Sequence, residues 1–170
     1  IKEILASMNI PVITLEGYEA DDILGTVSKK AQSLGYNVVI LSGDRDLLQL
    51  ADEHIKIRLP KTIKGRTEIE NYYPEDVMEK YMATPSEFID LKALMGDSSD
   101  NIPGVAGIGE KSAYHLLEEY QTLDGVYAHL EEIKGALNKK LSENKETAYF
   151  SQRLATIDTE VPIGVTLADC

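Results

Sequence analysis

The chain has 170 residues, of which 43% are hydrophobic and 27% charged, and its formal net charge is −12. This composition is ordinary for a soluble globular protein. No apolar run approaches the roughly 20 residues that a membrane-spanning helix needs, and Cys170 is the single cysteine, which excludes an internal disulfide. We therefore expect a cytoplasmic protein without a membrane partner. Taken alone, the negative charge argues against nucleic-acid binding, because phosphate contacts come from lysine and arginine.

The chain opens inside an amphipathic helical pattern at 1–10, which predicts a helix with one apolar face. Because a domain rarely begins within such a pattern, and the first residue is not methionine, we expect a fragment of a longer protein. An apolar run at 12–15 predicts a first strand. Helical spacing over 20–35 predicts a helix that ends at Gly35.

The run at 37–42 is continuously apolar and rich in β-branched residues, which predicts a strand buried on both faces. A short helix at 43–50 follows it. Helices that alternate with strands predict a parallel sheet with helices on its faces. Alternating patterns at 54–60 and 65–70, separated by a turn around Lys64 and Gly65, predict a more exposed pair of strands.

The rest of the chain has helical patterns and no strand pattern. A helix begins at Pro74, and Thr84, Pro85 and Glu87 form a capping signal for another that ends at Gly96. Further helices are predicted at 110–120, at 123–130 and, as one long helix, near 141–157. The sequence therefore predicts an α/β part, 1–73, followed by an all-α part, 74–170.

Three short motifs gather the acidic residues that point to chemistry. EADD at 19–22 and GDRD at 43–46 each follow a predicted strand, so in a parallel sheet they meet at the edge where ligands bind. GDSSD at 96–100 adds two more acids. Helix capping or simple turns explain some of these residues, but not all of them together. The candidate metal ligands are Glu19, Asp21, Asp22, Asp44, Asp46, Asp97 and Asp100.

Hard cations such as Mg²⁺ or Mn²⁺ prefer oxygen ligands and take few carboxylates each. Seven acids are more than one such site needs and are enough for two sites. Two metals roughly 4 Å apart activate water and stabilise the leaving oxygen of a phosphodiester. The sequence therefore predicts a two-metal centre acting on the phosphates of a nucleic acid.

A glycine-rich turn at 101–113 runs directly into a predicted helix. Its glycines allow the backbone to approach a ligand closely, and the helix N-terminus offers free amides to a phosphate. Hairpin–helix elements of this kind hold a DNA backbone without reading its sequence. The candidate DNA-binding residues are Gly104, Val105, Gly107, Ile108, Gly109 and Lys111.

EADD, GDRD and GDSSDNIPGVAGIGEKSA, in this order, resemble the 5′-nuclease domain of bacterial DNA polymerase I and the wider flap endonuclease family. The resemblance covers nearly the whole chain. It implies a PIN-like α/β core, a helix–three-turn–helix DNA-binding module, and two-metal hydrolysis of 5′ flaps and of nicked or branched duplex DNA. It also implies all seven acids as metal ligands, a K⁺ ion on the carbonyls of the 104–109 turn, and a polymerase domain on the same parent chain.

Two further ligands and a helical arch of the family would precede Ile1, so the site is expected to be incomplete in this chain. The alternative is therefore a metal- and DNA-binding scaffold without catalytic activity. A phosphatase of the haloacid-dehalogenase type is a third interpretation, because GDRDL supplies the two acids of its DxDx[TV] motif. Leu48, however, stands where that motif needs threonine or valine.

Overall fold

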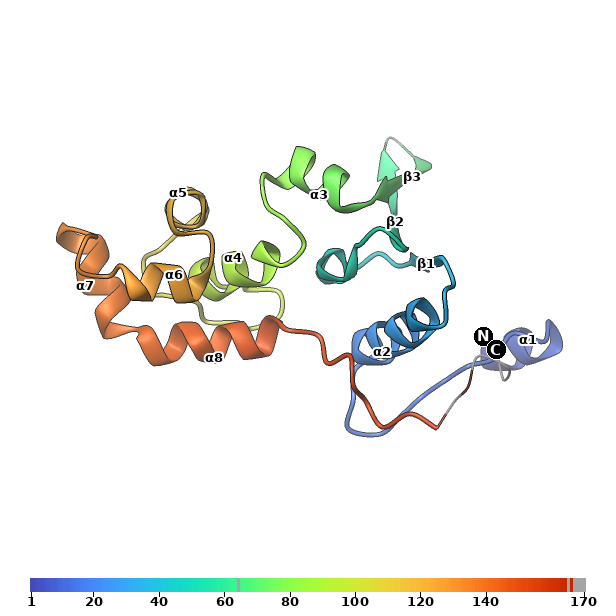
Figure 1. Cartoon of the computed structure of the whole chain (residues 1–170). Coiled ribbons are helices and arrows are strands. Elements are labelled where there is room, and N and C mark those ends of the chain that lie inside the picture. Colours follow the sequence, from blue (N-terminus) through green and yellow to red (C-terminus); the bar gives the residue numbers. More distant parts are fainter. Residues whose placement is uncertain (64, 165, 167–170) are drawn as a thin grey trace.

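The structure is a computed structural model that describes residues 1–63, 65–164 and 166. Two lobes lie side by side in Figure 1: an α/β lobe around a small sheet, and a lobe made of helices α4 to α8. Helix α1 (Lys2–Ser7) stands apart from both lobes, and it buries no residue. The predicted first helix is therefore confirmed, but Ile1, Ile4 and Met8 on its apolar face are exposed.

The sheet has three strands in the order β1 (Val38–Leu41), β2 (Ile55–Ile63) and β3 (Arg66–Tyr72). β1 pairs parallel to β2, with Val38 opposite Ile55. β2 and β3 form the antiparallel hairpin that the alternating patterns predict, and Lys64 in its turn lies outside the described residues. One face of the sheet packs on the 3₁₀ helix η1 (Asp46–Leu50) and its neighbours, and their core includes Ile40, Leu47, Leu48, Ile55 and Ile57.

Two strand predictions are wrong. Residues 12–15 form no strand, because Ile13 and Leu15 pack against a small cluster of Ile23, Val161 and Ile163 and pair with no strand. β1 is not buried on both faces. It is an edge strand, and alternate residues face away from the core, so Val39 is 53% exposed and Leu41 is 61% exposed.

The other helices of the first half follow their local signals. Helix α2 (Ala20–Ser33) ends before Gly35, which takes a positive φ, and α3 (Pro74–Tyr81) begins at its proline. Helix α4 (Glu87–Met95) ends at Gly96. The capping signal of α4 is realised in both directions: Thr84 N donates to Glu87 Oε2 at 2.7 Å, and Glu87 N donates to Thr84 Oγ1 at 3.3 Å.

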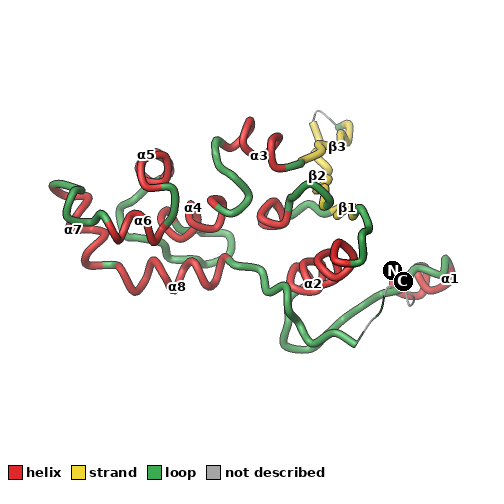
Figure 2. The backbone as a smooth tube through the Cα atoms, in the orientation of Figure 1, coloured by secondary structure: helices red, strands yellow, loops and turns green. Residues whose placement is uncertain are grey.

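The helical lobe continues with α5 (Glu110–Tyr120), α6 (Leu123–Ala128), α7 (Gly135–Glu143) and α8 (Lys145–Ala155). Figure 2 shows α7 and α8 as separate helices, so the single long helix predicted near 141–157 is wrong. Asn144 divides the two helices. Its Nδ2 donates to Lys140 O and closes α7, while its own carbonyl accepts from Ala148 N and starts α8.

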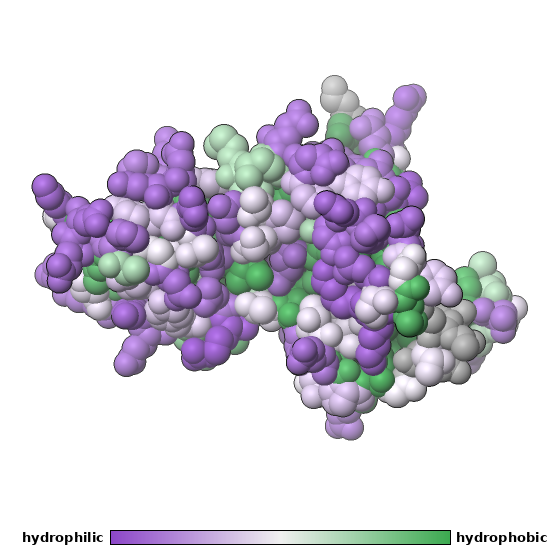
Figure 3. All heavy atoms as spheres, in the orientation of Figure 1, coloured by the Kyte–Doolittle hydropathy of each residue, from purple (hydrophilic) through white to green (hydrophobic). Residues whose placement is uncertain are grey.

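The surface shows where the two lobes meet. On the face drawn in Figure 3, hydrophilic side chains cover most of the molecule, and hydrophobic side chains are visible between the lobes.

Within the described ranges, no helix combines the length and the apolar character needed to cross a bilayer. Helix α4 lies at the centre of the helical lobe and packs against both α5 and α8.

Asp90 joins three helices of this lobe. It lies on α4 and is 7% exposed, and it accepts hydrogen bonds from Leu123 N (2.9 Å) at the start of α6 and from Gln152 Nε2 (2.6 Å) on α8. Burial raises the pKa of this carboxyl, against the opposing hydrogen bonds. We expect Asp90→Ala to lower the free energy of unfolding by about 3 kcal/mol, because two buried donors lose a charged acceptor.

Urea unfolding measures this loss, and Asp124→Ala is the matched control. Asp124 also links α6 to α8, through Tyr149 Oη at 2.7 Å, but that contact is exposed. Its removal is expected to cost less than about 1 kcal/mol. Equal losses in the free energy of unfolding for the two variants would show that burial does not strengthen the contribution of Asp90.

Candidate metal centre and nucleic-acid interface

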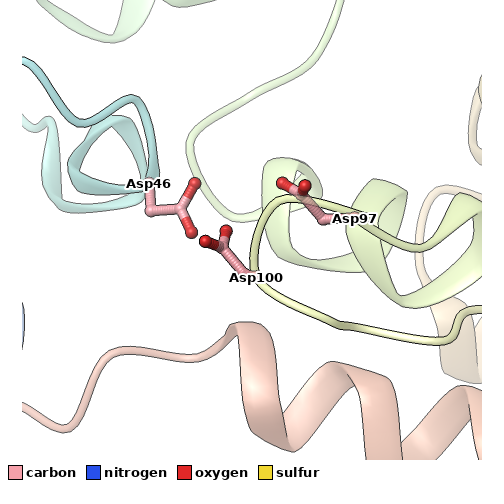
Figure 4. Close-up of side chains that lie close together, drawn as sticks. All are labelled: Asp46, Asp97 and Asp100. Carbon is pink, nitrogen blue, oxygen red and sulfur yellow. The ribbon is translucent and has the colours of Figure 1, made fainter.

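Three carboxylates meet at the junction of the two lobes. Asp46 begins η1 in the α/β lobe, and Asp97 and Asp100 lie on the loop that follows α4 in the helical lobe. One ligand oxygen from each lies within 4.8 Å of the others. Figure 4 shows Asp46 and Asp100 turned toward one another across the junction, with Asp97 beside them on the same loop as Asp100. This set is called the acidic triad below.

The loop that carries two of these acids is held by its own hydrogen bonds. Asp97 and Ile102 form an antiparallel bridge, with N···O distances of 2.9 and 2.8 Å. Asp97 Oδ1 also accepts from Ser99 N at 2.9 Å and from Ser99 Oγ. The loop is therefore a closed turn whose backbone fixes where the carboxylates project.

Lys92 of α4 reaches into the acidic triad, and sequence reasoning missed it. Its Nζ contacts Asp46 Oδ1, Asp97 Oδ2 at 2.8 Å and Asp100 Oδ2 at 3.3 Å, and its side chain is 8% exposed. Burial alone would lower the pKa of Lys92, but its hydrogen bonds with Asp46 and Asp97 raise it. The signal available in the sequence was a lysine surrounded by the apolar residues of 88–95.

The pKa values of the triad follow from burial and from this lysine. The hydrogen bond from Lys92, helped by those from Ser99, lowers the pKa of Asp97 well below its usual range. Burial raises the pKa of Asp46, although its contact with Lys92 opposes the shift. Lys92 therefore stabilises the ionised form of both carboxyls.

Asp21 and Asp44 extend the negative charge around Asp46. Burial raises the pKa of Asp21 to about 6, and the nearby charges of Asp44, Asp46, Glu19 and Asp22 contribute in the same direction. Asp44 is exposed, and its Oδ1 accepts from Asp46 N at 3.0 Å. The EADD and GDRD motifs therefore do lie near one another, although the first of them follows no strand.

Asp22 has a structural role. Its Oδ2 accepts from Glu19 N at 3.2 Å, which caps α2, and its Oδ1 accepts from Asp158 N at 2.9 Å. Glu19 is the N-cap residue of the same helix and is exposed. Capping, the ordinary reason for acids in a first helical turn, thus accounts for part of EADD.

The donor set fits a hard divalent cation. Carboxylate oxygens from Asp46, Asp97 and Asp100 converge within a few ångströms, and oxygen donors of this kind suit Mg²⁺, Mn²⁺ or Ca²⁺. Asp21 is half-buried against like charges, which a divalent cation would offset. Which acids hold a metal remains a prediction from the sequence.

The glycine-rich turn lies directly beside the triad, because its backbone packs on the loop of Asp97. Gly104 has a φ of +63°, and a Cβ placed there would lie 2.2 Å from Gly96 N. Its N–H donates to Ser151 Oγ, a fully buried hydroxyl on α8, at 2.9 Å. Two candidate DNA-binding residues, Val105 and Ile108, have side chains buried in the helical core, so only their backbone is available to a ligand.

Lys140 is a second functional candidate that sequence reasoning missed. It lies on α7, and its Nζ donates to the carbonyl of Gly107 at 2.7 Å. Lys111 is exposed in the first turn of α5, which directly follows the same turn in the chain. Two cations therefore border the turn. No local sequence signal could link Lys140 to a turn 33 residues earlier.

Two family models together span the whole chain. The model described as the 5′-3′ exonuclease N-terminal resolvase-like domain matches residues 1–82, and that described as the 5′-3′ exonuclease C-terminal SAM fold matches residues 83–170. The chain belongs to the 5′-3′ exonuclease family. As a 5′-3′ exonuclease family member it has the mixed α/β part and the helical part that its motifs imply.

The curated relatives of this 5′-3′ exonuclease chain include DNA polymerase I of Bacillus caldotenax, 48% identical over 170 residues, and DNA polymerase I of Bacillus subtilis, 47% identical over 169 residues. Both alignments cover 99% of this chain and 19% of the relative. The chain thus spans about a fifth of the length of these polymerases.

Solved structures with the same fold include T5 5′-exonuclease with bound divalent metal ions (zinc), with a TM-score of 0.78 and 28% identity. Another is the bacteriophage T5 flap endonuclease in a pseudo-enzyme–product complex with DNA and metal ions, with a TM-score of 0.78 and 27% identity. Each likeness covers 92% of this chain and 56% of the T5 chain. The catalytic core of Rad2 with DNA substrate, at a TM-score of 0.60 and 19% identity, shares the fold.

Proposed function

We propose that this chain acts in a metal-dependent, structure-specific 5′-3′ nuclease that hydrolyses DNA at 5′ flaps and at nicked or branched duplex. The observation that carries the proposal is the acidic triad at the junction of the two lobes, directly beside a glycine-rich turn bordered by cations. Gly104, at the start of this turn, packs on Gly96, at the start of the loop that carries Asp97 and Asp100, so the turn and the acids belong to one continuous segment. Membership of the 5′-3′ exonuclease family supports the same activity.

Mg²⁺ or Mn²⁺ is the proposed cofactor, with two ions in the complete site. The proposed ligands are the triad together with the acids around Asp21 and Asp44, which include Glu19 and Asp22. When bound, such ions supply the positive charge that activates a water and stabilises the leaving oxygen of a phosphodiester. The carboxylates position that charge, and none of them becomes covalently attached to DNA. The T5 5′-exonuclease structure with bound divalent metal ions (zinc) supports a divalent metal in this fold.

The turn at 104–109, with Lys111 and Lys140, is the proposed DNA backbone site. Its contacts are to phosphate and therefore carry no sequence information. A K⁺ ion on the turn carbonyls is part of the proposal. The chain covers about a fifth of its DNA polymerase I relatives, which supports a polymerase domain on the same parent chain. A cytoplasmic location is part of the proposal.

We expect Lys140→Ala to weaken binding of duplex DNA and to reduce the slope of log K against log salt by about 0.9, the value of one phosphate contact on B-DNA. Lys139→Ala is the matched control, because Lys139 is the preceding residue of α7, its side chain is 75% exposed, and it pairs with Glu143. Fluorescence anisotropy at several salt concentrations measures both slopes. Equal slopes for the two variants would remove Lys140 from the DNA site.

A labelled 5′-flap DNA tests the function directly. Cleavage by residues 1–170 that requires Mg²⁺ or Mn²⁺ and stops on chelation supports the nuclease. The alternative is a scaffold that binds metal and DNA without cleaving. DNA binding with no metal-dependent cleavage, both by this chain and by the longest natural protein that carries it, would establish the scaffold and reject the nuclease.

A further inference from the structure

Lys92 is a buried cation among acids that come from both lobes. Its side chain is 8% exposed, and its ammonium contacts Asp46 of the α/β lobe and Asp97 and Asp100 of the helical lobe. Helix α4, which carries Lys92, also packs against η1, which carries Asp46. The lysine therefore joins the lobes at the point where the triad forms.

The contacts use all the hydrogen-bonding capacity of the ammonium. A lysine ammonium has three donors and no acceptor, and here it meets three carboxylates. Three carboxylates with one ammonium leave two formal negative charges in place of three. The cluster thus already contains part of the positive charge that its acids require.

A cation from solution that bound the triad would share its three carboxylates with Lys92. Divalent ions bind carboxylate oxygens at roughly 2.0–2.6 Å, and one oxygen of each triad member already points to Lys92. An ammonium and a divalent ion cannot both lie at close range to the same three oxygens without strong repulsion.

We propose that Lys92 is a built-in competitor for the divalent cation: it holds the acidic triad together when no metal is bound, and it gives up these contacts when the metal binds. Lys92 is a positioning residue that sets the metal affinity of the centre. The inference rests on the proposed metal centre, but it concerns metal binding and needs no DNA cleavage to be tested.

Calorimetric titration with Mn²⁺ tests the competition. We expect Lys92→Met to bind Mn²⁺ at least roughly tenfold more tightly than the natural chain, because one positive charge within about 4 Å of the ligands is removed. Lys92→Arg retains the charge and is expected to keep the natural affinity within about threefold. Unchanged or weaker binding by Lys92→Met would overturn the proposal.

Lys29→Met is the matched control for net charge. Lys29 pairs with Asp52 at 2.6 Å on the α/β lobe, so its removal also leaves one acid without its cation. Its Mn²⁺ affinity is expected to stay within about twofold of the natural value, because Lys29 pairs with an acid that is none of the proposed ligands and salt screens such partly exposed charges. A gain equal to that of Lys92→Met would assign the effect to overall charge and reject the proposal.

A measurement on the natural chain covers the case in which Lys92→Met fails to fold. An amine-selective reagent followed by peptide mass spectrometry is expected to label Lys92 slowly without metal and several-fold faster in saturating Mn²⁺, while exposed Lys139 reacts equally in both. Protection of Lys92 that persists with Mn²⁺ bound would reject the displacement. If Lys92→Met binds Mn²⁺ more tightly but no form cleaves flap DNA, the nuclease proposal fails and this one stands.

Discussion

Replacing Asp97 by alanine is expected to lower Mg²⁺-dependent cleavage of a 5′-flap DNA by more than about a hundredfold, because even residues that only support a ligand typically contribute roughly 10–100-fold. Asp97 lies in the triad, and hydrogen bonds from Lys92 and Ser99 keep it ionised. Asp44→Ala is expected to abolish cleavage in the same way. The assay uses the longest natural protein that carries the chain, with cleavage rates measured over a range of Mg²⁺ concentrations.

A loss of cleavage is informative about the catalytic site only if the variants remain folded. Asp44 is exposed, and Asp97 is held in a loop whose bridge to Ile102 uses only backbone atoms, so both variants should keep the circular dichroism spectrum of the natural protein. Glu68→Ala on β3 removes an exposed carboxylate far along the chain from every acidic motif and serves as the control. Near-normal cleavage by Asp44→Ala and Asp97→Ala would overturn the assignment of the site.

Signals that act over a few residues predicted most of the helices correctly. Pro74 and the Thr84–Glu87 capping box mark helix starts, and Gly35 and Gly96 mark helix ends, because each supplies a local hydrogen bond or a backbone angle that the helix terminus requires. The acidic motifs and the glycine-rich turn were also found in this way. The residues that define each of these motifs are close together in the sequence.

Features that depend on contacts between distant segments could not be predicted in this way. The run at 12–15 has the composition of a strand, but its partners are Val161 and Ile163 near the other end of the chain. From the sequence, Lys92 is an ordinary residue of a helix, and only the folded structure shows its contact with Asp46. Lys140 of α7 likewise comes next to the turn only through its contact with Gly107.

Replacing Gly104 by alanine is expected to lower the free energy of unfolding by about 4 kcal/mol or more, a loss seen only where a specific structural conflict arises. The new Cβ would lie 2.2 Å from Gly96 N and 2.6 Å from Gly96 Cα, and backbone atoms cannot move aside as a side chain can. Movement of Gly104 would also break its hydrogen bond to the buried Ser151. Thermal and urea unfolding measure the loss.

Gly135→Ala separates the conflict from the backbone angle. Gly135 has a φ of +71°, close to the +63° of Gly104, but nothing lies within 4 Å of its Cβ position. Only the left-handed backbone angle is then penalised, at about 1–2 kcal/mol. A similar loss for the two variants would show that the close approach of Gly104 to Gly96 is unimportant.

The same pair of variants links the fold to the site. Asp97 and Asp100 lie on the loop between Gly96 and Gly104, so the close contact of these two glycines fixes where both carboxylates meet Asp46. Gly104→Ala is therefore expected to weaken Mn²⁺ binding as well as stability, even at a temperature where the variant remains folded. Gly135→Ala lies outside this loop and should reduce stability alone, because the geometry of the triad does not depend on it.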